Sequence, residues 1–176
     1  MFEVDDFVKW AYGNLLNNTT RAVVGEYLVH KALDSSTKQR IDWDAYDILY
    51  KGFKIEVKSS GYLQTWNKER KYSKITFDIS KKDPWLSKKN KSLGKVCRYS
   101  DLWIFCVHNE KDISKANSLD ETQWEFYCST TKWIDKEFGD QKSVGLSILV
   151  NKGLQPVIFN ELKSHMDIII KEQLPK

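Results

Sequence analysis

Three residues in one short segment could support metal chemistry: Asp47, Glu56 and Lys58. Polar and apolar residues alternate over 53–58, which predicts a half-buried strand with Glu56 and Lys58 on its polar face. Carboxylate oxygens are the ligands that Mg²⁺ prefers, and a neighbouring ammonium group stabilises developing negative charge. These residue types therefore suggest a divalent metal site beside a lysine that orients water or stabilises charge.

A two-residue turn at Lys51-Gly52 is expected to join this strand to a preceding one, with Gly52 supplying a positive φ. The turn sets a register in which Asp47 lies directly opposite Glu56. Opposed Cβ atoms in a hairpin are roughly 4.5–5.5 Å apart, and like charges there repel. The pairing thus predicts a cation held between the two carboxylates. The alternative is an ordinary solvated strand face, on which Glu-x-Lys is common.

A helix from Arg21 to Leu33, capped by Thr19 or Thr20, is predicted to add a further carboxylate, Glu26. Residues at helical spacing form one mainly apolar stripe: Ala22, Glu26, Val29 and Leu33. A carboxylate on that stripe is costly unless it is paired or bound to a metal. Glu26 on the rim of the helix is the alternative reading.

The order of these residues resembles the PD-(D/E)xK nucleases of the restriction-endonuclease-like superfamily. Glu26 on a helix, Asp47, and then Glu56-Val57-Lys58 follow that family's pattern and spacing. The resemblance implies that Asp47, Glu56 and the Val57 carbonyl bind the metal, with Glu26 completing the acidic cluster directly or through water. It implies that Lys58 positions or activates the attacking water, with Mg²⁺ as cofactor and Mn²⁺ as a substitute.

The resemblance also implies an α/β (α+β) fold, a mixed central β-sheet flanked by α-helices. Gln64 resembles a polar residue that some branches of the family place near the substrate strand. The sequence departs from the family pattern at Tyr46, which stands where the motif has proline.

A basic stretch follows the hairpin, with eleven Lys or Arg residues against three acidic ones over 68–98. Such an excess predicts a surface for a polyanion, because phosphate contacts dominate nucleic-acid affinity. A solvated lysine-rich surface is the alternative. Tyr62 or Trp66, just beyond the hairpin, could stack on a base or sugar, and a core or strand-end aromatic is the alternative. The candidate substrate-binding residues are Gln64, Trp66, Lys71 and Lys74.

Composition indicates one globular domain over residues 1–176, with 41% hydrophobic and 30% charged residues and a formal net charge of +4. No apolar run approaches the roughly 20 residues of a membrane span, and no signal peptide is evident. The three cysteines lack metal-binding spacing and are expected to be free thiols. A cytoplasmic location is expected.

Periodicity and capping residues predict the remaining elements. In chain order they are a helix over 4–15 packed on the core, a strand over 74–79, a basic loop over 81–94, a buried central strand over 102–107, a strand over 124–129, a helix from Thr130 or Thr131 to Phe138, a strand or short helix over 145–150, and a closing helix over 161–173.

The sequence therefore predicts a metal-dependent nuclease that hydrolyses phosphodiester bonds, with DNA as the expected substrate. A catalytically inactive nucleic-acid-binding protein of the same fold is one alternative, and a protein–protein interaction module is another. No recognition domain is evident, so a targeting partner or a homodimer would be compatible with this function.

Overall fold

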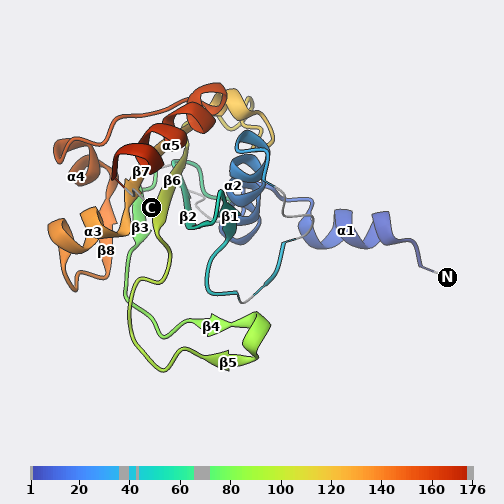
Figure 1. Cartoon of the computed structure of the whole chain (residues 1–176). Helices are drawn as coiled ribbons and strands as arrows, with labels where there is room; N and C mark the ends of the chain where they lie inside the picture. The colour runs from blue at the N-terminus through green and yellow to red at the C-terminus, as the bar shows by residue number, and fades with distance from the viewer. Residues whose placement is uncertain (1, 36–39, 43, 66–71, 174–176) are drawn as a thin grey trace.

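A four-stranded mixed β-sheet forms the centre of the computed structural model, which describes residues 2–35, 40–42, 44–65 and 72–173. The strands lie in the order β1 (Ile48–Tyr50), β2 (Phe53–Gly61), β6 (Leu102–His108) and β7 (Trp124–Thr130). β2 pairs with β1 antiparallel and with β6 parallel, and β7 pairs with β6 antiparallel. Helices surround this sheet, so the expected α+β class with a mixed sheet is confirmed (Figure 1).

The paired part of the β1–β2 hairpin has the predicted register, with Ile48 opposite Ile55 and Tyr50 opposite Phe53. The expected pairing of Asp47 with Glu56 is not formed, because Asp47 precedes the paired residues and its N–H donates to the Ile55 carbonyl. Both turn residues have positive φ, 51° at Lys51 and 86° at Gly52. Two consecutive positive φ values are typical of the type I′ turn, whose twist matches that of the flanking strands. The short turn therefore fixes which side chains of the two strands lie beside one another.

β6 is buried along its whole length, as its continuous apolar run predicts. It lies between β2 and β7 and thereby brings together parts of the chain that are far apart in sequence. The parallel pairing of β2 with β6 begins at Ile55 opposite Leu102 and ends at Gly61 opposite His108.

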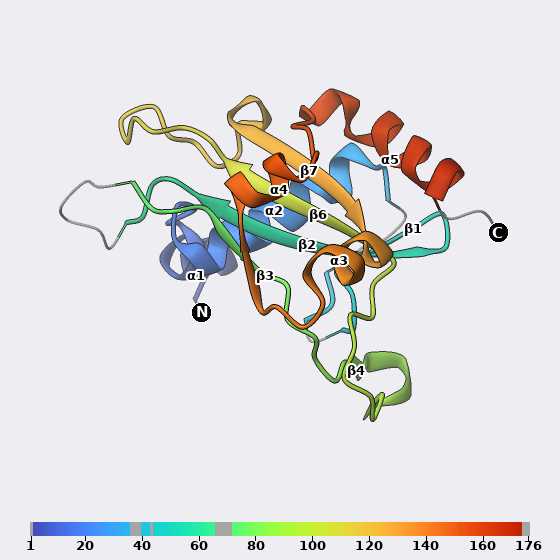
Figure 2. The ribbon, with the colours of Figure 1, turned by 90° about the vertical axis from the view of Figure 1, so that its left-hand side faces the viewer.

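One face of the sheet packs against α2 (Asn18–Ala32) and α5 (Phe159–Gln173) (Figure 2). Asn17 caps α2 by accepting a hydrogen bond from the Thr19 N–H at 3.0 Å, so the expected cap at Thr19 or Thr20 is wrong. Gly25 brings α2 close to β2, because a Cβ at this position would lie 1.9 Å from the Ser59 Oγ. The core on this face includes Val29, Ile55, Val57, Ile104, Phe126 and Leu162.

The opposite face is covered by smaller elements. These are β3 (Thr76–Asp78), α3 (Thr131–Phe138), β8 (Ser143–Gly145) and α4 (Leu146–Asn151). The predicted third strand is present, but it pairs with β8 in a separate two-stranded sheet. Thr130 caps α3, as predicted, by accepting a hydrogen bond from the Trp133 N–H at 3.1 Å. This layer buries Phe77, Phe105, Ile134 and Leu149.

The basic segment predicted as a loop contains a small hairpin that extends from the body of the molecule (Figure 1). It consists of β4 (Trp85–Leu86), the 3₁₀ turn η1 (Ser87–Lys89) and β5 (Lys91–Ser92). A second 3₁₀ turn, η2 (Glu121–Gln123), precedes β7. We refer to residues 82–97 as the basic arm.

The first helix, α1 (Val4–Tyr12), does not pack on the core as its apolar spacing predicts, since none of its residues is buried. It extends away from the other elements at the N-terminal end (Figure 1). Within the described residues, no helix has the length and apolar character needed to cross a bilayer.

Candidate active site

A cavity of about 310 Å³ opens beside the polar face of β2. Three predicted site residues line it together: Asp47, Glu56 and Lys58. Its other walls come from the end of β3, from Trp103 on β6 and from the base of the basic arm. The structure thus places the carboxylates and the ammonium at one hollow, beside the most basic part of the chain.

Glu56 and Lys58 form an ion pair along the strand, with the Lys58 Nζ 2.5 Å from the Glu56 Oε1. Ser100 donates a hydrogen bond from its hydroxyl to the other Glu56 oxygen at 3.2 Å. Burial opposes the charge on Lys58, but the carboxylates of Glu56, Asp47 and Asp78 outweigh it and raise the pKa of Lys58. Lys58 is therefore a fixed positive charge at neutral pH.

Asp47 lies one residue before the paired part of β1, and its main-chain N–H donates to the Ile55 carbonyl at 3.0 Å. Its carboxylate accepts a hydrogen bond from the Val57 N–H at 2.7 Å. Burial, followed by repulsion from Glu56 and Glu26, raises the pKa of Asp47 to about 7, although the Val57 N–H and Lys58 act in the opposite direction. Burial and the neighbouring carboxylates thus disfavour the charged form of Asp47, which a bound cation would stabilise.

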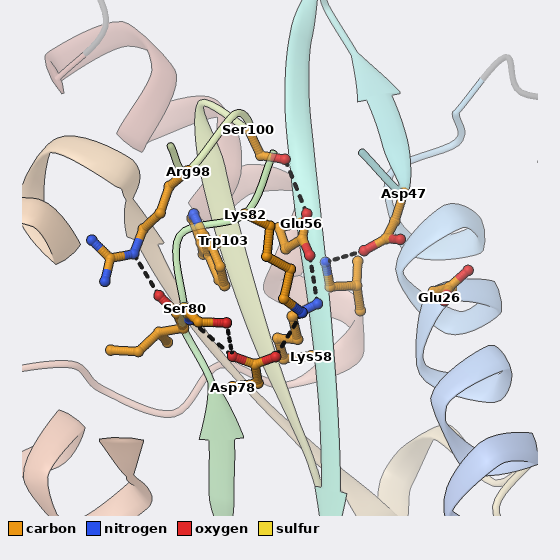
Figure 3. A network of polar contacts seen from close by, with 12 residues as sticks. Glu26, Asp47, Glu56, Lys58, Asp78, Ser80, Lys82, Arg98, Ser100 and Trp103 are labelled. Carbon is orange, nitrogen blue, oxygen red and sulfur yellow. Dashed lines mark hydrogen bonds and ion pairs between the residues drawn. The ribbon is translucent and has the colours of Figure 1, made fainter. Parts of the chain in front are cut away.

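Glu26 lies on α2, on the Asp47 side of β2 (Figure 3). It does not line the cavity, and its carboxylate forms a bidentate ion pair with Arg40, with the Arg40 Nη2 3.1 Å from the Glu26 Oε1. Only 14% of the Glu26 side chain is exposed, and its charge contributes to the raised pKa of Asp47. Glu26 is thus an electrostatic neighbour of the site whose own charge is balanced by Arg40.

The wall opposite Lys58 contains residues that the sequence analysis did not single out. Asp78, at the end of β3, accepts hydrogen bonds from the Ser80 hydroxyl at 2.5 Å and from Lys82 at 2.7 Å. Burial would raise the pKa of Asp78, but these hydrogen bonds prevail and lower it to about 2. Arg98 lines the same wall and donates to the Ile79 carbonyl at 2.6 Å. In the sequence, the alternation of polar Asp78 and Ser80 with apolar Ile79 was the one pattern that could have placed these two polar side chains on a common face.

The predicted substrate-binding residues lie elsewhere or outside the described residues. Gln64 follows β2, accepts a hydrogen bond from buried Arg21 at 3.3 Å and does not line the cavity. Lys74 is exposed just before β3 and does not line it either. Trp66 and Lys71 fall within 66–71, outside the described residues.

The donor atoms at the cavity fit a hard divalent cation, because the Asp47 and Glu56 carboxylates offer oxygen ligands. Across residues 2–35, 40–42, 44–65 and 72–173, no group of three or more His, Cys, Asp or Glu residues is placed to hold a metal ion. Two carboxylates are nevertheless sufficient for Mg²⁺, which commonly retains waters and binds through one or two carboxylates plus substrate phosphates. Direct metal binding by Glu26 would require it to leave Arg40.

No protein-family model matches this sequence, and no curated protein matches it significantly.

Proposed function

We propose that this chain is a metal-dependent nuclease of the PD-(D/E)xK type, with a restriction-endonuclease-like fold, acting on DNA. The observation that carries the proposal is the convergence of Asp47, Glu56 and Lys58 on one cavity. Asp47 directly precedes the first strand of the hairpin, and Glu56 and Lys58 lie two positions apart on the second strand, β2. The order of these residues along the chain is that of the family pattern.

In this proposal Asp47, Glu56 and the Val57 carbonyl hold Mg²⁺ or Mn²⁺. When bound, the ion lowers the pKa of a coordinated water and neutralises charge on the phosphate. Lys58 adds a permanent positive charge near the reacting phosphate and orients the attacking water. Ser100 supports this geometry, because its hydroxyl holds one Glu56 oxygen in place.

The Lys58–Glu56 ion pair suggests that Lys58 changes its partner when a metal ion binds. Without a cation, Lys58 neutralises Glu56 directly. A divalent ion at Glu56 would release the ammonium for the substrate phosphate. The buried surroundings strengthen both interactions, since charge pairs are screened less where water is excluded.

A second hollow, of about 250 Å³, continues from the first and shares Asp44 and Tyr99 with it. Lys54 and Lys89 line this hollow, and neither forms an ion pair with a described residue. Lys54 lies on the same face of β2 as Lys58, four residues earlier, or about 13 Å along the strand. We propose that a nucleic-acid strand runs from Lys58 towards Lys54 along the basic arm.

One observation favours the alternative of a binding protein without hydrolysis. The Glu26 carboxylate is engaged by Arg40, so two of the three predicted carboxylate ligands, Asp47 and Glu56, line the cavity. A protein that only binds nucleic acid would retain the basic arm and would not need divalent metal.

The test is cleavage of supercoiled plasmid, linear duplex, single-stranded DNA and RNA, each with Mg²⁺ or Mn²⁺. We expect Lys58→Ala and Glu56→Gln to reduce the cleavage rate by at least about 100-fold. Lys152→Ala is the matched control, because Lys152 forms a 2.7 Å ion pair with Glu137 on the α3–α4 side of the molecule. This control should cleave like the wild type.

Equal cleavage by the wild type, Lys58→Ala and Glu56→Gln would reject the assignment of the site. Absence of metal-dependent cleavage of every substrate, combined with retained DNA binding, would favour the binding-only alternative. Calorimetric titration with Mg²⁺ separates the two independently, since only the nuclease proposal requires an affinity that Asp47→Ala removes.

A further inference from the structure

α1 exposes an unusually large set of apolar side chains. Phe7, Trp10 and Tyr12 are 56%, 85% and 54% exposed, and Val4 is 74% exposed. None of the nine residues of the helix is buried. Single exposed apolar residues are normal on a protein surface, but a contiguous set of this size marks an interaction site.

The apolar side chains of α1 form one stripe, which Trp10 and Tyr12 flank. Val4, Phe7, Val8 and Ala11 follow the spacing i, i+3, i+4, i+7, which places them on one stripe. The charged residues Asp5, Asp6 and Lys9 lie on the other side. α1 is therefore built to pack through one face, although none of the described elements buries a residue of that face.

A groove that fits such a helix lies at the outer side of α2. Its volume is about 850 Å³, and it is lined mainly by apolar side chains. Val23, Tyr27 and Leu119 line it and are 38%, 49% and 52% exposed. Tyr12, the last residue of α1, and Leu15, in the junction that follows, form one end of the groove. The chain thus carries both an uncovered amphipathic helix and an uncovered apolar groove.

We propose that two copies of this chain form a symmetric dimer in which each α1 packs in the α2 groove of the other copy. α1 leads away from the rest of the molecule (Figure 1), and of its nine residues only Tyr12 lines the groove of its own chain. An exchange related by a two-fold axis uses the same two surfaces twice and leaves neither uncovered.

The area available is sufficient for a stable dimer. A buried aromatic side chain contributes about 150–250 Å², and α1 together with Phe2 carries four that are at least half exposed. Two such helices, together with the groove surfaces they cover, exceed the roughly 1,200 Å² of a specific interface. Because these residues take no part in the candidate active site, the inference is independent of the proposed function.

The first test is the mass of the intact protein in solution, measured by light scattering from about 1 to 100 µM. We expect a mass of two chains. Phe7→Ser and Trp10→Ser should each weaken association at least about 30-fold, since large aromatic residues dominate interface energies. These variants should still fold, because α1 contributes no side chain to the core.

Ile148→Ser is the matched control, because Ile148 is 43% exposed on α4, on the far side of the molecule from α1 (Figure 1). It should remain dimeric, whereas Val23→Asp in the groove should not. A monomeric wild type, or a dimer unaffected by Phe7→Ser, Trp10→Ser and Val23→Asp, would overturn the proposal.

A second test distinguishes exchange between chains from packing of α1 on its own groove. Two differently tagged chains, both carrying Cys97→Ser, are prepared, one with Phe7→Cys and the other with Val23→Cys. The two chains are mixed and treated with a short bismaleimide cross-linker. Cys97 is replaced because it is partly exposed, whereas the other two cysteines are buried. A cross-link between the two tagged chains supports the proposal. With both substitutions in one chain, a product that remains at monomer mass overturns it.

Discussion

The Val57 main-chain N–H donates a hydrogen bond to the Asp47 carboxylate at 2.7 Å, which joins the start of β1 to the centre of β2. This bond holds Asp47 at the cavity although the residue lies beyond the last paired position of its strand. Val57 thereby positions one candidate ligand through its N–H, next to Glu56, which is the other. The hairpin acts as a single unit that presents both carboxylates.

Asp47 makes the stability of the metal-free protein depend on pH. Burial and the neighbouring carboxylates raise its pKa from 3.8 to about 7, so the folded state binds a proton more tightly than the unfolded state. Its contribution to stability is full below about pH 4 and is lost as the pH rises to 7. Asp47→Asn retains an acceptor for Val57 and should be more stable than the wild type at pH 8, by on the order of 2 kcal/mol.

Urea unfolding of both proteins at pH 4 and pH 8, without divalent metal, measures this difference. The advantage of Asp47→Asn should shrink at pH 4, where both side chains are neutral. An advantage that is independent of pH would show that the carboxylate does not titrate as described.

The close approach of α2 to β2 predicts that Gly25→Ala is destabilising despite the better helix propensity of alanine. The added Cβ would lie 1.9 Å from the Ser59 Oγ, so the helix or the strand must shift. Overpacking of this kind typically costs about 1–3 kcal/mol, and the helix-propensity gain of about 1 kcal/mol offsets only part of it.

Gly25→Ala/Ser59→Ala is the matched control. Removal of the Ser59 hydroxyl leaves the Ser59 and Cys106 Cβ atoms, 3.3 and 3.6 Å from the new methyl group, as the nearest contacts. Thermal unfolding should therefore show that the double variant recovers most of the loss. Equal destabilisation of the single and double variants would mean that another contact limits the approach.

Replacement of Arg21 is expected to have a second strong effect on stability. Its side chain is buried, at 2% exposure, and donates to the Leu63 carbonyl at 2.7 Å and to the Asn18 side chain at 2.5 Å. Burial lowers the pKa of Arg21. Arg21→Lys keeps the charge but loses the planar set of donors, so we expect a cost of about 2–3 kcal/mol in denaturant unfolding.

Gln64→Ala is the control for Arg21, because it removes the 3.3 Å contact with the guanidinium group and a 3.3 Å hydrogen bond to the Gly61 carbonyl, but leaves the bonds from Arg21 to Leu63 and Asn18. Its cost should stay below about 1 kcal/mol. If Gln64→Ala reduced DNA cleavage without changing stability, the substrate-binding role predicted from the sequence would be supported.

The basic arm predicts a salt-dependent contribution to DNA affinity. Lys89, Lys91 and Lys95 are exposed, and no ion pair to a described residue involves them. Replacing all three with glutamine should weaken binding and reduce the slope of log K against log salt concentration by up to about 3. Fluorescence anisotropy at several salt concentrations, with Ca²⁺ in place of Mg²⁺, measures the slope.

The matched control is a triple variant in which glutamine replaces Lys115, Lys163 and Lys171. These three lysines are exposed, and none of them lines either hollow. This control should leave the slope almost unchanged. Equal losses from both triple variants would indicate non-specific attraction to overall charge instead of a defined path along the arm.

Local sequence determined the elements whose geometry depends on neighbouring residues. The alternation over 53–58 and the Lys51-Gly52 turn specified the β1–β2 register, because a two-residue loop allows few pairings. The apolar run over 102–107 specified a buried strand, and Thr130 specified the start of α3. These features also placed Glu56 and Lys58 on a common face.

Only the tertiary structure decided which distant segments meet. β3 pairs with β8, Ser100 donates to Glu56 and Asp78 lines the cavity, all through contacts between residues far apart in the chain. The apolar stripe of α1 predicted a buried helix, but the stripe does not specify which surface covers it. The spacing of apolar residues indicates that one face of a helix is to be buried. Which surface buries it depends on how all the elements pack together.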